Sequence, residues 1–431
     1  MRPTPKPLDV LHPSRRHWLR TAAAGGVAAL APWAGLSLAG TATPGGPRLV
    51  LMILRGGLDG LSAVPAVADP NFAEARGALG RFASPALPLD NLFALHPALP
   101  GLHAMYGQGE LLVVHATGLP YRERSHFDGQ QVLESGGERP FALSTGWLGR
   151  ALAGSSRKAM ALQSSVPLVL RGHTEVDTWA PSSRPDPGAD LVARLERLYL
   201  DDVPLAAALA RARELRAGSG GDSMSLASSP AGGMADGMAG GMAGGTAAST
   251  VPGPARQPAL LLARQAAQFL ARPDGPQAAV LDLSGWDSHA NQVADPGPLV
   301  NNLRLLDASL GALREGLSGP AAGDTWRRTV VLVVTEFGRT VAINGTQGTD
   351  HGSGGAALLL GGAVRGGRVI ADWPGLAPAQ RFEGRDLRIT TDLRALFKTV
   401  LIEHLGLDPV RISQQALPGS TGLARLDLLR A

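Results

Sequence analysis

The 431-residue sequence contains no cysteine, and only 4% of its residues are aromatic. Without cysteine the chain has no disulfide framework, thiolate zinc site, iron–sulfur cluster or cysteine nucleophile. So few aromatic side chains leave little material for stacking the bases of a nucleic acid. The remaining composition, 44% hydrophobic and 18% charged, is that of a globular protein. Any metal in such a protein would depend on carboxylate and imidazole ligands.

The net charge of +4 comes from residues 1–42 alone. That segment has one acid, Asp9, and five basic residues: Arg2, Lys6, Arg15, Arg16 and Arg20. The rest of the chain is neutral overall. A basic surface for nucleic acid or anionic lipid is therefore not predicted for the body of the protein.

The same segment has the order of an export signal. The pair Arg15-Arg16 precedes an uncharged run from Thr21 to Ala42, whose last small residues offer a cleavage site after Ala42. A buried helix or a permanent membrane anchor is the alternative, but Pro32 and the Gly/Ala content make this run a poor span. We expect residues 1–42 to be a twin-arginine signal peptide. The export machinery would deliver the mature protein to the periplasm or beyond, with no stable membrane span after cleavage.

Short apolar runs alternate with helical patterns along the mature chain. The runs lie at 49–54, 111–114, 166–170, 279–283, 330–334 and 356–360. Each is typical of a strand buried on both faces. Leucines spaced by three and four draw one apolar stripe over 299–317, and a similar stripe covers 393–405. This alternation predicts an α/β fold with a mostly parallel central sheet flanked by helices.

Residues 217–258 have a different composition, rich in Gly, Ser, Ala and Met. Met234, Met238 and Met242 are spaced like a helix face, but each neighbouring glycine would cost a helix about 1 kcal/mol. We expect a flexible surface insertion; a soft-metal site built from the thioethers is the alternative. Candidate ligands lie on both sides of the insertion, so residues 43–431 are predicted to form a single domain.

Acids and histidines follow two of the predicted strands, where parallel sheets build their sites. Asp59 lies between glycines, either presenting its carboxylate at the sheet edge or forming a plain Asx turn. Asp287 and His289 are two residues apart, so an extended segment would place both on one side. They would then form a ligand pair suited to zinc, manganese or iron. A capped helix start with an incidental histidine is the other interpretation.

Two further candidates lie between the last two predicted strands, and three others precede a predicted helix. Glu336 lies at the end of a very apolar predicted strand, and His351 lies in a Gly-rich loop before the next predicted strand. Ser125 precedes a predicted helix. It is either a nucleophile at the helix N-terminus or an ordinary N-cap residue. Arg122 and Arg124 would neutralise phosphate or sulfate oxygens, or form a solvated charged turn.

The order of these motifs resembles a known family. The twin-arginine leader is followed by Leu54–Gly60, Arg124–Asp128, Gly285–His289, Thr335–Thr340 and Gly348–Gly352. This order resembles the secreted family catalogued as domain of unknown function 1501, which looks like a branch of the alkaline phosphatase and sulfatase superfamily. The resemblance implies an alkaline-phosphatase-like α/β sandwich with metals at the carboxyl edge of its sheet.

The resemblance also implies roles for individual residues. Ser125 would be the nucleophile, and a divalent ion (zinc, manganese or calcium) would be held by Asp59, Asp287, His289, Glu336 and His351. Substrate contacts would come from Arg124, His126 and Arg339. Phe337 stands where that superfamily has a second-site imidazole, so a second metal is in question. The expected activity is hydrolysis of a small anionic phosphate or sulfate ester. The alternative is a metal-binding or assembly protein that has lost catalysis.

Overall fold

The computed structural model describes residues 45–182, 187–218 and 256–430, all of which belong to one compact unit, Ala42–Ala431. The strands are β1 (Arg48–Arg55), β2 (Leu87–Pro88), β3 (Ala94–Leu95), β4 (Leu111–Gly118), β5 (Ala159–Ala161), β6 (Val176–Thr178), β7 (Ala278–Ser284), β8 (Thr329–Val334), β9 (Gly355–Leu360), β10 (Arg368–Ile370) and β11 (Thr391–Asp392). The longer helices are α4 (Pro100–Gly107), α5 (His126–Ser135), α6 (Trp147–Leu152), α7 (Ala189–Leu198), α8 (Val203–Gly218), α9 (Arg256–Ala271), α10 (Pro298–Ser318) and α11 (Leu393–Thr399). Short helices are α2 (Gly60–Ala63), α3 (Phe72–Arg76) and α12 (Pro409–Arg411).

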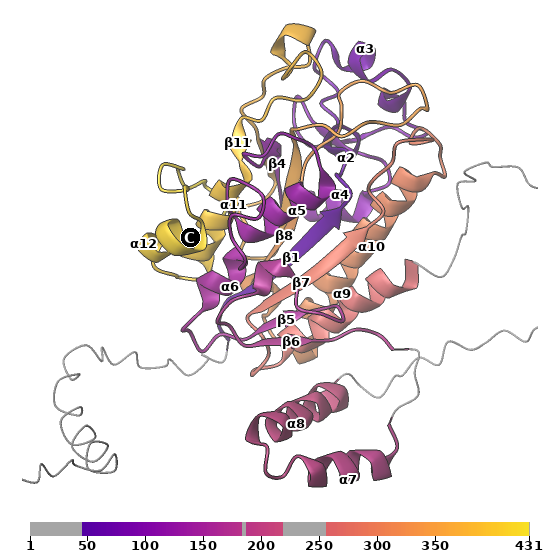
Figure 1. Cartoon of the computed structure of the whole chain (residues 1–431). Helices are drawn as coiled ribbons and strands as arrows, with labels where there is room; N and C mark the ends of the chain where they lie inside the picture. Colours follow the sequence, from indigo (N-terminus) through magenta and orange to yellow (C-terminus); the bar gives the residue numbers. More distant parts are fainter. Residues whose placement is uncertain (1–44, 183–186, 219–255, 431) are drawn as a thin grey trace, which may run out of the picture. The chain divides into compact units, whose positions relative to one another are not determined.

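Nine strands form one sheet in the order β10-β4-β9-β8-β1-β7-β5-β6, with β11 also paired to β4 (Figure 1). All pairs are parallel except those of β9, which runs antiparallel to both β4 and β8. The predicted α/β fold with a mostly parallel sheet is therefore confirmed. Since β9 is reversed, its beginning lies at the same edge as the ends of β8, β1 and β7.

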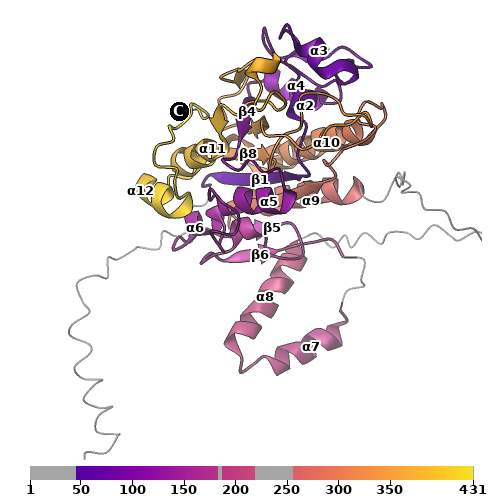
Figure 2. The same ribbon diagram turned by 45° about the horizontal axis from the view of Figure 1, so that its top comes forward.

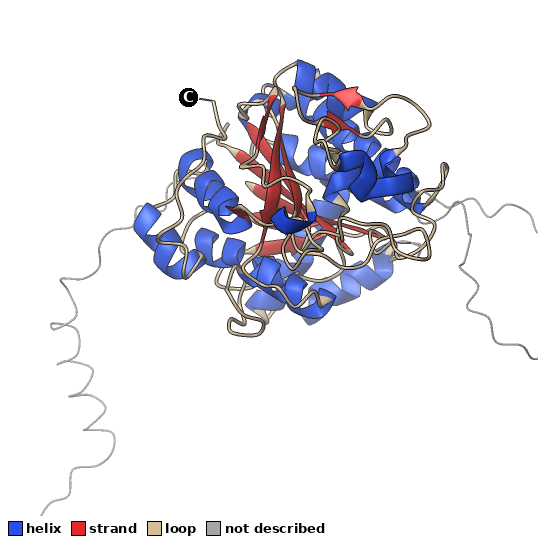
Figure 3. Ribbon diagram, turned by 90° about the horizontal axis from the view of Figure 1, so that it is seen from above, coloured by secondary structure: helices blue, strands red, loops and turns tan. Residues whose placement is uncertain are grey.

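Helices cover both faces of the sheet (Figure 3). Along β1, Val50, Met52 and Leu54 enter one buried cluster, shared with α4, α9 and α10. Leu49, Leu51 and Ile53 enter the other, shared with α5, α6 and α11. A strand buried on both faces must be apolar at every position, which is why the run in β1 shows no polar alternation. The predicted leucine stripe of α10 is buried throughout.

Five of the six predicted strands are present, and the sixth was wrong. Residues 166–170 contain a short 3₁₀ turn, Leu168–Leu170, instead of a strand. Pro167 lacks the N–H that a strand inside a sheet must donate, so an apolar run alone is not enough there. The three-residue strands β5 and β6 were not predicted, because they are too short to show a pattern.

Two sequence predictions remain predictions. The proposed signal peptide lies outside the described residues, as do residues 219–255 of the proposed insertion. Helices α8 and α9 include the first and last residues of that insertion, since α8 ends at Gly218 and α9 begins at Arg256. None of the helices among the described residues is both long and apolar enough to cross a bilayer.

Candidate metal centre

Loops from β1, β7 and β8 meet the start of α5 and the loop before β9 at one edge of the sheet. Helix α5 lies beside the end of β1 in two views (Figures 1 and 2). There, Arg55 donates hydrogen bonds to Gln130 (3.1 Å) and Glu134 (2.9 Å) of the helix. This edge holds most of the predicted site residues, and it brings His126, Asp287, His289 and His351 together. We call these four residues the histidine cluster.

The Nε2 atoms of His126 and His289 both face that of His351, and all three face one carboxylate oxygen. His351 Nε2 lies 3.0 Å from His126 Nε2 and 3.0 Å from His289 Nε2. Asp287 Oδ1 lies 3.0 Å from His289 Nε2, 3.2 Å from His351 Nε2 and 3.4 Å from His126 Nε2. His126, Asp287 and His351 alone already offer three ligand atoms within 4.8 Å of one another. The four residues of the cluster therefore come from two separate loops and a helix.

Each imidazole turns its other nitrogen, Nδ1, toward an oxygen acceptor. These contacts are His126 to Glu336 Oε1 (2.8 Å), His289 to Asp350 Oδ1 (3.2 Å) and His351 to the carbonyl oxygen of Arg124 (2.9 Å). A carbonyl or carboxylate oxygen can only accept, so each Nδ1 carries the proton. In a neutral imidazole, the Nε2 atom that faces the cluster then carries a lone pair and no proton. This acceptor behind each histidine is the usual outer shell of a metal-ligating imidazole.

This arrangement fits a divalent cation. Nitrogen lone pairs and a carboxylate oxygen that lie 3.0–3.4 Å from their neighbours repel one another unless positive charge lies among them. Donor atoms placed tetrahedrally at about 2 Å from a zinc ion would be about 3.3 Å from each other. The donor set and its spacing therefore suit a metal of the zinc type. Calcium, which the sequence left open, prefers an all-oxygen shell and fits these imidazoles poorly.

Arg339 is hydrogen-bonded to Asp287 and to the loops around the cluster. Its side chain is buried and donates to Asp287 Oδ1 (2.6 Å) as well as to the carbonyl oxygens of Gly57 (2.8 Å), Thr349 (3.1 Å) and Trp286 (3.1 Å). Burial alone would raise the pKa of Asp287, but the hydrogen bond and charge of Arg339 outweigh it and lower that pKa to about 2. The resemblance implied that Arg339 contacts the substrate. Instead, its donors are directed to the loops and to Asp287, which they keep ionised.

Arg124 also differs from its expected role. Its guanidinium is bound by Asp386 (2.8 Å) and Glu383 (2.5 Å), so it does not stand free for an anion. Its backbone takes φ 61°, a region that non-glycine residues rarely occupy, and its carbonyl accepts from His351. Arg124 therefore contributes to the cluster through its main chain.

Ser125 lies between Arg124, whose carbonyl oxygen contacts the cluster, and His126, which belongs to it. It occupies the N-cap position of α5, but its side chain makes no capping hydrogen bond. Its backbone N–H donates to the hydroxyl of Tyr121 (3.2 Å). The ordinary N-cap role is therefore not taken, and Ser125 is instead hydrogen-bonded to Tyr121 at the start of the helix.

Glu336 and Phe337 are buried and contact the imidazoles of the cluster from the protein interior. The buried Glu336 carboxylate accepts from His126, from the N–H of Gly56 (2.8 Å) and from Gln130 (3.1 Å). Phe337 packs on His126, with ring centroids 4.7 Å apart, and on His351 at 5.1 Å. The sequence placed Glu336 among the metal ligands and His126 among the substrate contacts. In the structure His126 faces the cluster directly, and Glu336 holds it from behind.

Two glycines let these loops approach each other. A Cβ on Gly56, which has φ +117°, would lie 2.5 Å from the backbone nitrogen of Asp287. A Cβ on Gly348 would lie 2.2 Å from the carbonyl group of His289. A side chain at either position would push the ligand-bearing loops apart.

Residues 103–424 match the model of the family described as Protein of unknown function (DUF1501). The chain belongs to this family. The resemblance seen in the motif order is thereby confirmed at the level of the family. No curated protein matches the chain in sequence.

The chain is also similar to several solved structures. A phosphonate monoester hydrolase from Agrobacterium radiobacter shares 12% identity, with 84% of this chain and 74% of that chain covered and a TM-score of 0.38. The protein Ps i-CgsB shares 10% identity over 84% and 72% of the two chains, with a TM-score of 0.40. A sulfatase from Pseudoalteromonas sp. shares 13% identity over 75% and 64%, with a TM-score of 0.33.

Asp59 belongs to a separate network in this DUF1501 protein. Its carboxylate is buried and accepts from Arg76 (2.5 Å), from the Ser62 hydroxyl (2.8 Å) and from Gln292. Burial would raise its pKa, but the charge of Arg76 and these hydrogen bonds lower it below the usual value. Arg76 is itself fully buried and donates to the carbonyl oxygens of Thr340 (3.2 Å) and Val341 (2.8 Å). Asp59 is thus neutralised by a guanidinium, in contrast to its expected role as a metal ligand.

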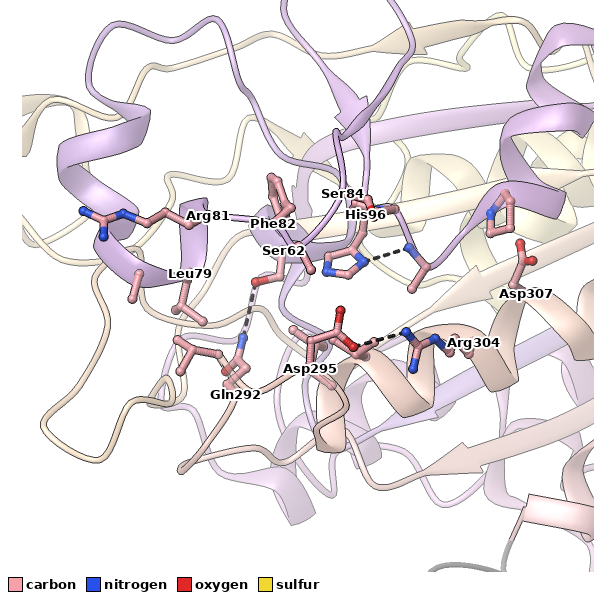
Figure 4. A pocket seen from close by; sticks show the side chains of 18 of the residues that line it. Ser62, Leu79, Arg81, Phe82, Ser84, His96, Gln292, Asp295, Arg304 and Asp307 are labelled. Atoms are coloured by element: carbon pink, nitrogen blue, oxygen red, sulfur yellow. Dashed lines mark hydrogen bonds and ion pairs between the residues drawn. The ribbon is translucent and has the colours of Figure 1, made fainter.

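A pocket of about 360 Å³ lies against this network. Figure 4 shows Ser62 and Gln292 facing each other at its wall, joined by a hydrogen bond of 3.3 Å. Gln292 also accepts from the hydroxyl of Thr349 (2.7 Å), two residues before His351. The network therefore links the pocket to the loop that carries a member of the histidine cluster.

The sequence also missed residues that support the site. Asp350 and Arg76 received no role, although one holds His289 and the other neutralises Asp59. Asp350 stands next to His351 in the sequence, and that adjacency was an available signal. Arg76 lies 17 residues from Asp59 in an unremarkable segment, so only the fold brings the two together.

Proposed function

We propose that the chain is a periplasmic, divalent-metal-dependent hydrolase that acts on a phosphate or sulfate ester. The histidine cluster carries the proposal. His126, Asp287 and His351 offer three converging ligand atoms, His289 lies against two of them, and an acceptor orients the outer nitrogen of every imidazole. The periplasmic location rests on the Arg15-Arg16 leader. That pathway exports proteins already folded around a cofactor, which agrees with a cysteine-free metal centre.

The three-nitrogen, one-oxygen donor set favours zinc or manganese over calcium. When bound, such an ion would supply positive charge for the ester oxygens and for the serine oxygen. The chain's own residues do the remaining work. Glu336, Asp350 and the Arg124 carbonyl orient the imidazoles, and Arg339 keeps Asp287 ionised. We assign the role of nucleophile to Ser125, which lies at the N-terminus of α5, makes no capping bond and precedes His126 of the cluster.

A second candidate function is metal binding without catalysis. Phe337 packs on two of the cluster imidazoles, where the resemblance leads one to expect a further imidazole. Asp59 is neutralised by Arg76. Both features favour a single ion, and a protein with one ion could keep the fold while serving in assembly.

Turnover by the full chain, loaded with zinc or manganese, separates the two functions. The wild-type protein, Ser125→Ala and the matched control Ser84→Ala, an exposed serine of the pocket, are assayed with phosphate and sulfate mono- and diesters. We expect turnover that falls about a thousandfold or more in Ser125→Ala only. Metal binding with no turnover of any ester would favour the second function, and a protein that binds no metal would contradict both.

A further inference from the structure

Two phenylalanine rings are unusually exposed at the start of α5 and in the segment that follows it. The side chain of Phe127 is 85% exposed and that of Phe141 is 73% exposed. Among the exposed large apolar side chains of the described residues, these two alone are aromatic. Phenylalanine is usually buried, and its ring has no polar group that would favour contact with water. Such exposure next to a candidate site indicates a surface that has an apolar partner.

Phe141 is held in place by a dedicated contact. Its backbone has φ 57°, which a bulky side chain disfavours. The amide of Gln131 holds the segment at two points: Oε1 accepts from the N–H of Phe141 (2.8 Å) and Nε2 donates to the carbonyl of Leu143 (2.8 Å). Strained backbone that is kept by its surroundings is concentrated at functional sites. These two hydrogen bonds of Gln131, which we call the clamp, therefore hold the backbone that carries the exposed Phe141 ring in a strained conformation.

Helix α5 connects this ring to the histidine cluster. Phe127 directly follows His126, whose Nε2 faces the cluster, and Gln131 lies one turn further on the same side as Phe127. Five residues of helix span roughly 7.5 Å, so the clamp on Phe141 lies about that far along the axis from His126. Phe127 and the segment that carries Phe141 are thus attached to the same helix end that delivers His126 to the cluster.

We propose that Phe127 and Phe141 form an aromatic platform that binds the apolar, ring-containing group of the ester, while the anionic group faces the histidine cluster. This inference rests on the proposed function and specifies its substrate class. Phenyl rings recognise their partner by apolar contact and ring stacking. The platform therefore selects aryl esters over esters of short alkyl groups.

Binding of two non-hydrolysable probes tests the platform without requiring turnover. Phenylphosphonate and methylphosphonate are titrated into the zinc-loaded full chain by calorimetry. We expect phenylphosphonate to bind about tenfold more tightly. Phe127→Ala and Phe141→Ala should each reduce that preference and together abolish it, with methylphosphonate binding unchanged. Gln131→Ala should reduce it too, although both rings remain, because the clamp on Phe141 is lost.

Val410→Ala is the matched control, since Val410 is 59% exposed on α12 and is expected to leave the preference intact. Equal binding of the two probes, or a phenyl preference that survives in the double variant, overturns the platform alone. If zinc binds but neither phosphonate does, the proposed hydrolase function is overturned together with the platform. Failure to bind zinc, measured separately, overturns the proposed function at its first step.

Discussion

Asp59 and Asp287 follow neighbouring parallel strands, β1 and β7, yet their surroundings give them opposite roles. Asp59 is 2% exposed and is neutralised by the fully buried guanidinium of Arg76. Asp287 is 45% exposed, and its Oδ1 faces three imidazole nitrogens as well as Arg339. A carboxylate at a strand end is therefore structural when a fixed cation saturates it. It is suited to ligate a metal ion when the groups beside it also offer lone pairs.

The histidines show the same contrast. His96 and His115 are buried away from the cluster, and burial lowers the pKa of each to about 4. His126 is only partly buried, and its hydrogen bond to Glu336 raises its pKa. Buried imidazoles outside the site are thus kept neutral by their surroundings, while those of the cluster are oriented by acceptors.

Breaking the ion pair at Asp59 should have the largest effect on stability. Arg76→Met leaves a buried carboxylate without its cation, so we expect the free energy of unfolding to fall by about 3–5 kcal/mol. Urea denaturation measures the change. The double variant Asp59→Asn/Arg76→Met should recover part of the loss, because the unpaired charge is gone. An Arg76→Met protein as stable as the wild type would contradict the structural role of this pair.

His115 should make stability depend on pH. Its imidazole takes up a proton near pH 6.5 when unfolded but only near pH 4 when folded. The unfolded state therefore gains protons first, and stability falls as the pH decreases from about 6.5 to 4, by about 3 kcal/mol in total. Urea denaturation across this range should show a shallower loss for His115→Gln than for the wild type. Equal slopes would show that His115 is not held neutral.

A smaller effect is expected from the outer shell of the cluster. Asp350→Asn weakens the acceptor that holds His289 Nδ1, so metal affinity should fall about tenfold with little change in stability. Competition with a chelator measures the affinity. Asp427→Asn is the matched control, because Asp427 is a similarly exposed carboxylate paired with Arg365 and Arg368. A similar loss in both variants would argue against a specific role for Asp350.

The sequence predicted the long strands and the loops that carry acids and histidines, because apolar runs and turn residues are local signals. It failed at Pro167, where one missing N–H outweighs an apolar run. The roles of Asp59 and Arg339 could not be read locally either. Both depend on a buried guanidinium meeting a carboxylate across 17 residues in one case and 52 in the other. His126 was predicted to contact the substrate, and only the packing of α5 against Phe337 and Glu336 shows that it faces His351.

The metal content of the purified full chain tests the central claim most directly. After incubation with zinc and removal of free metal, mass spectrometry of the elements should find about one ion per chain in the wild type. The ion should be lost in His351→Ala and retained in His103→Ala, a histidine outside the cluster that contacts the Pro88 carbonyl. A wild-type protein without bound zinc, or equal zinc content in the two variants, would contradict the account.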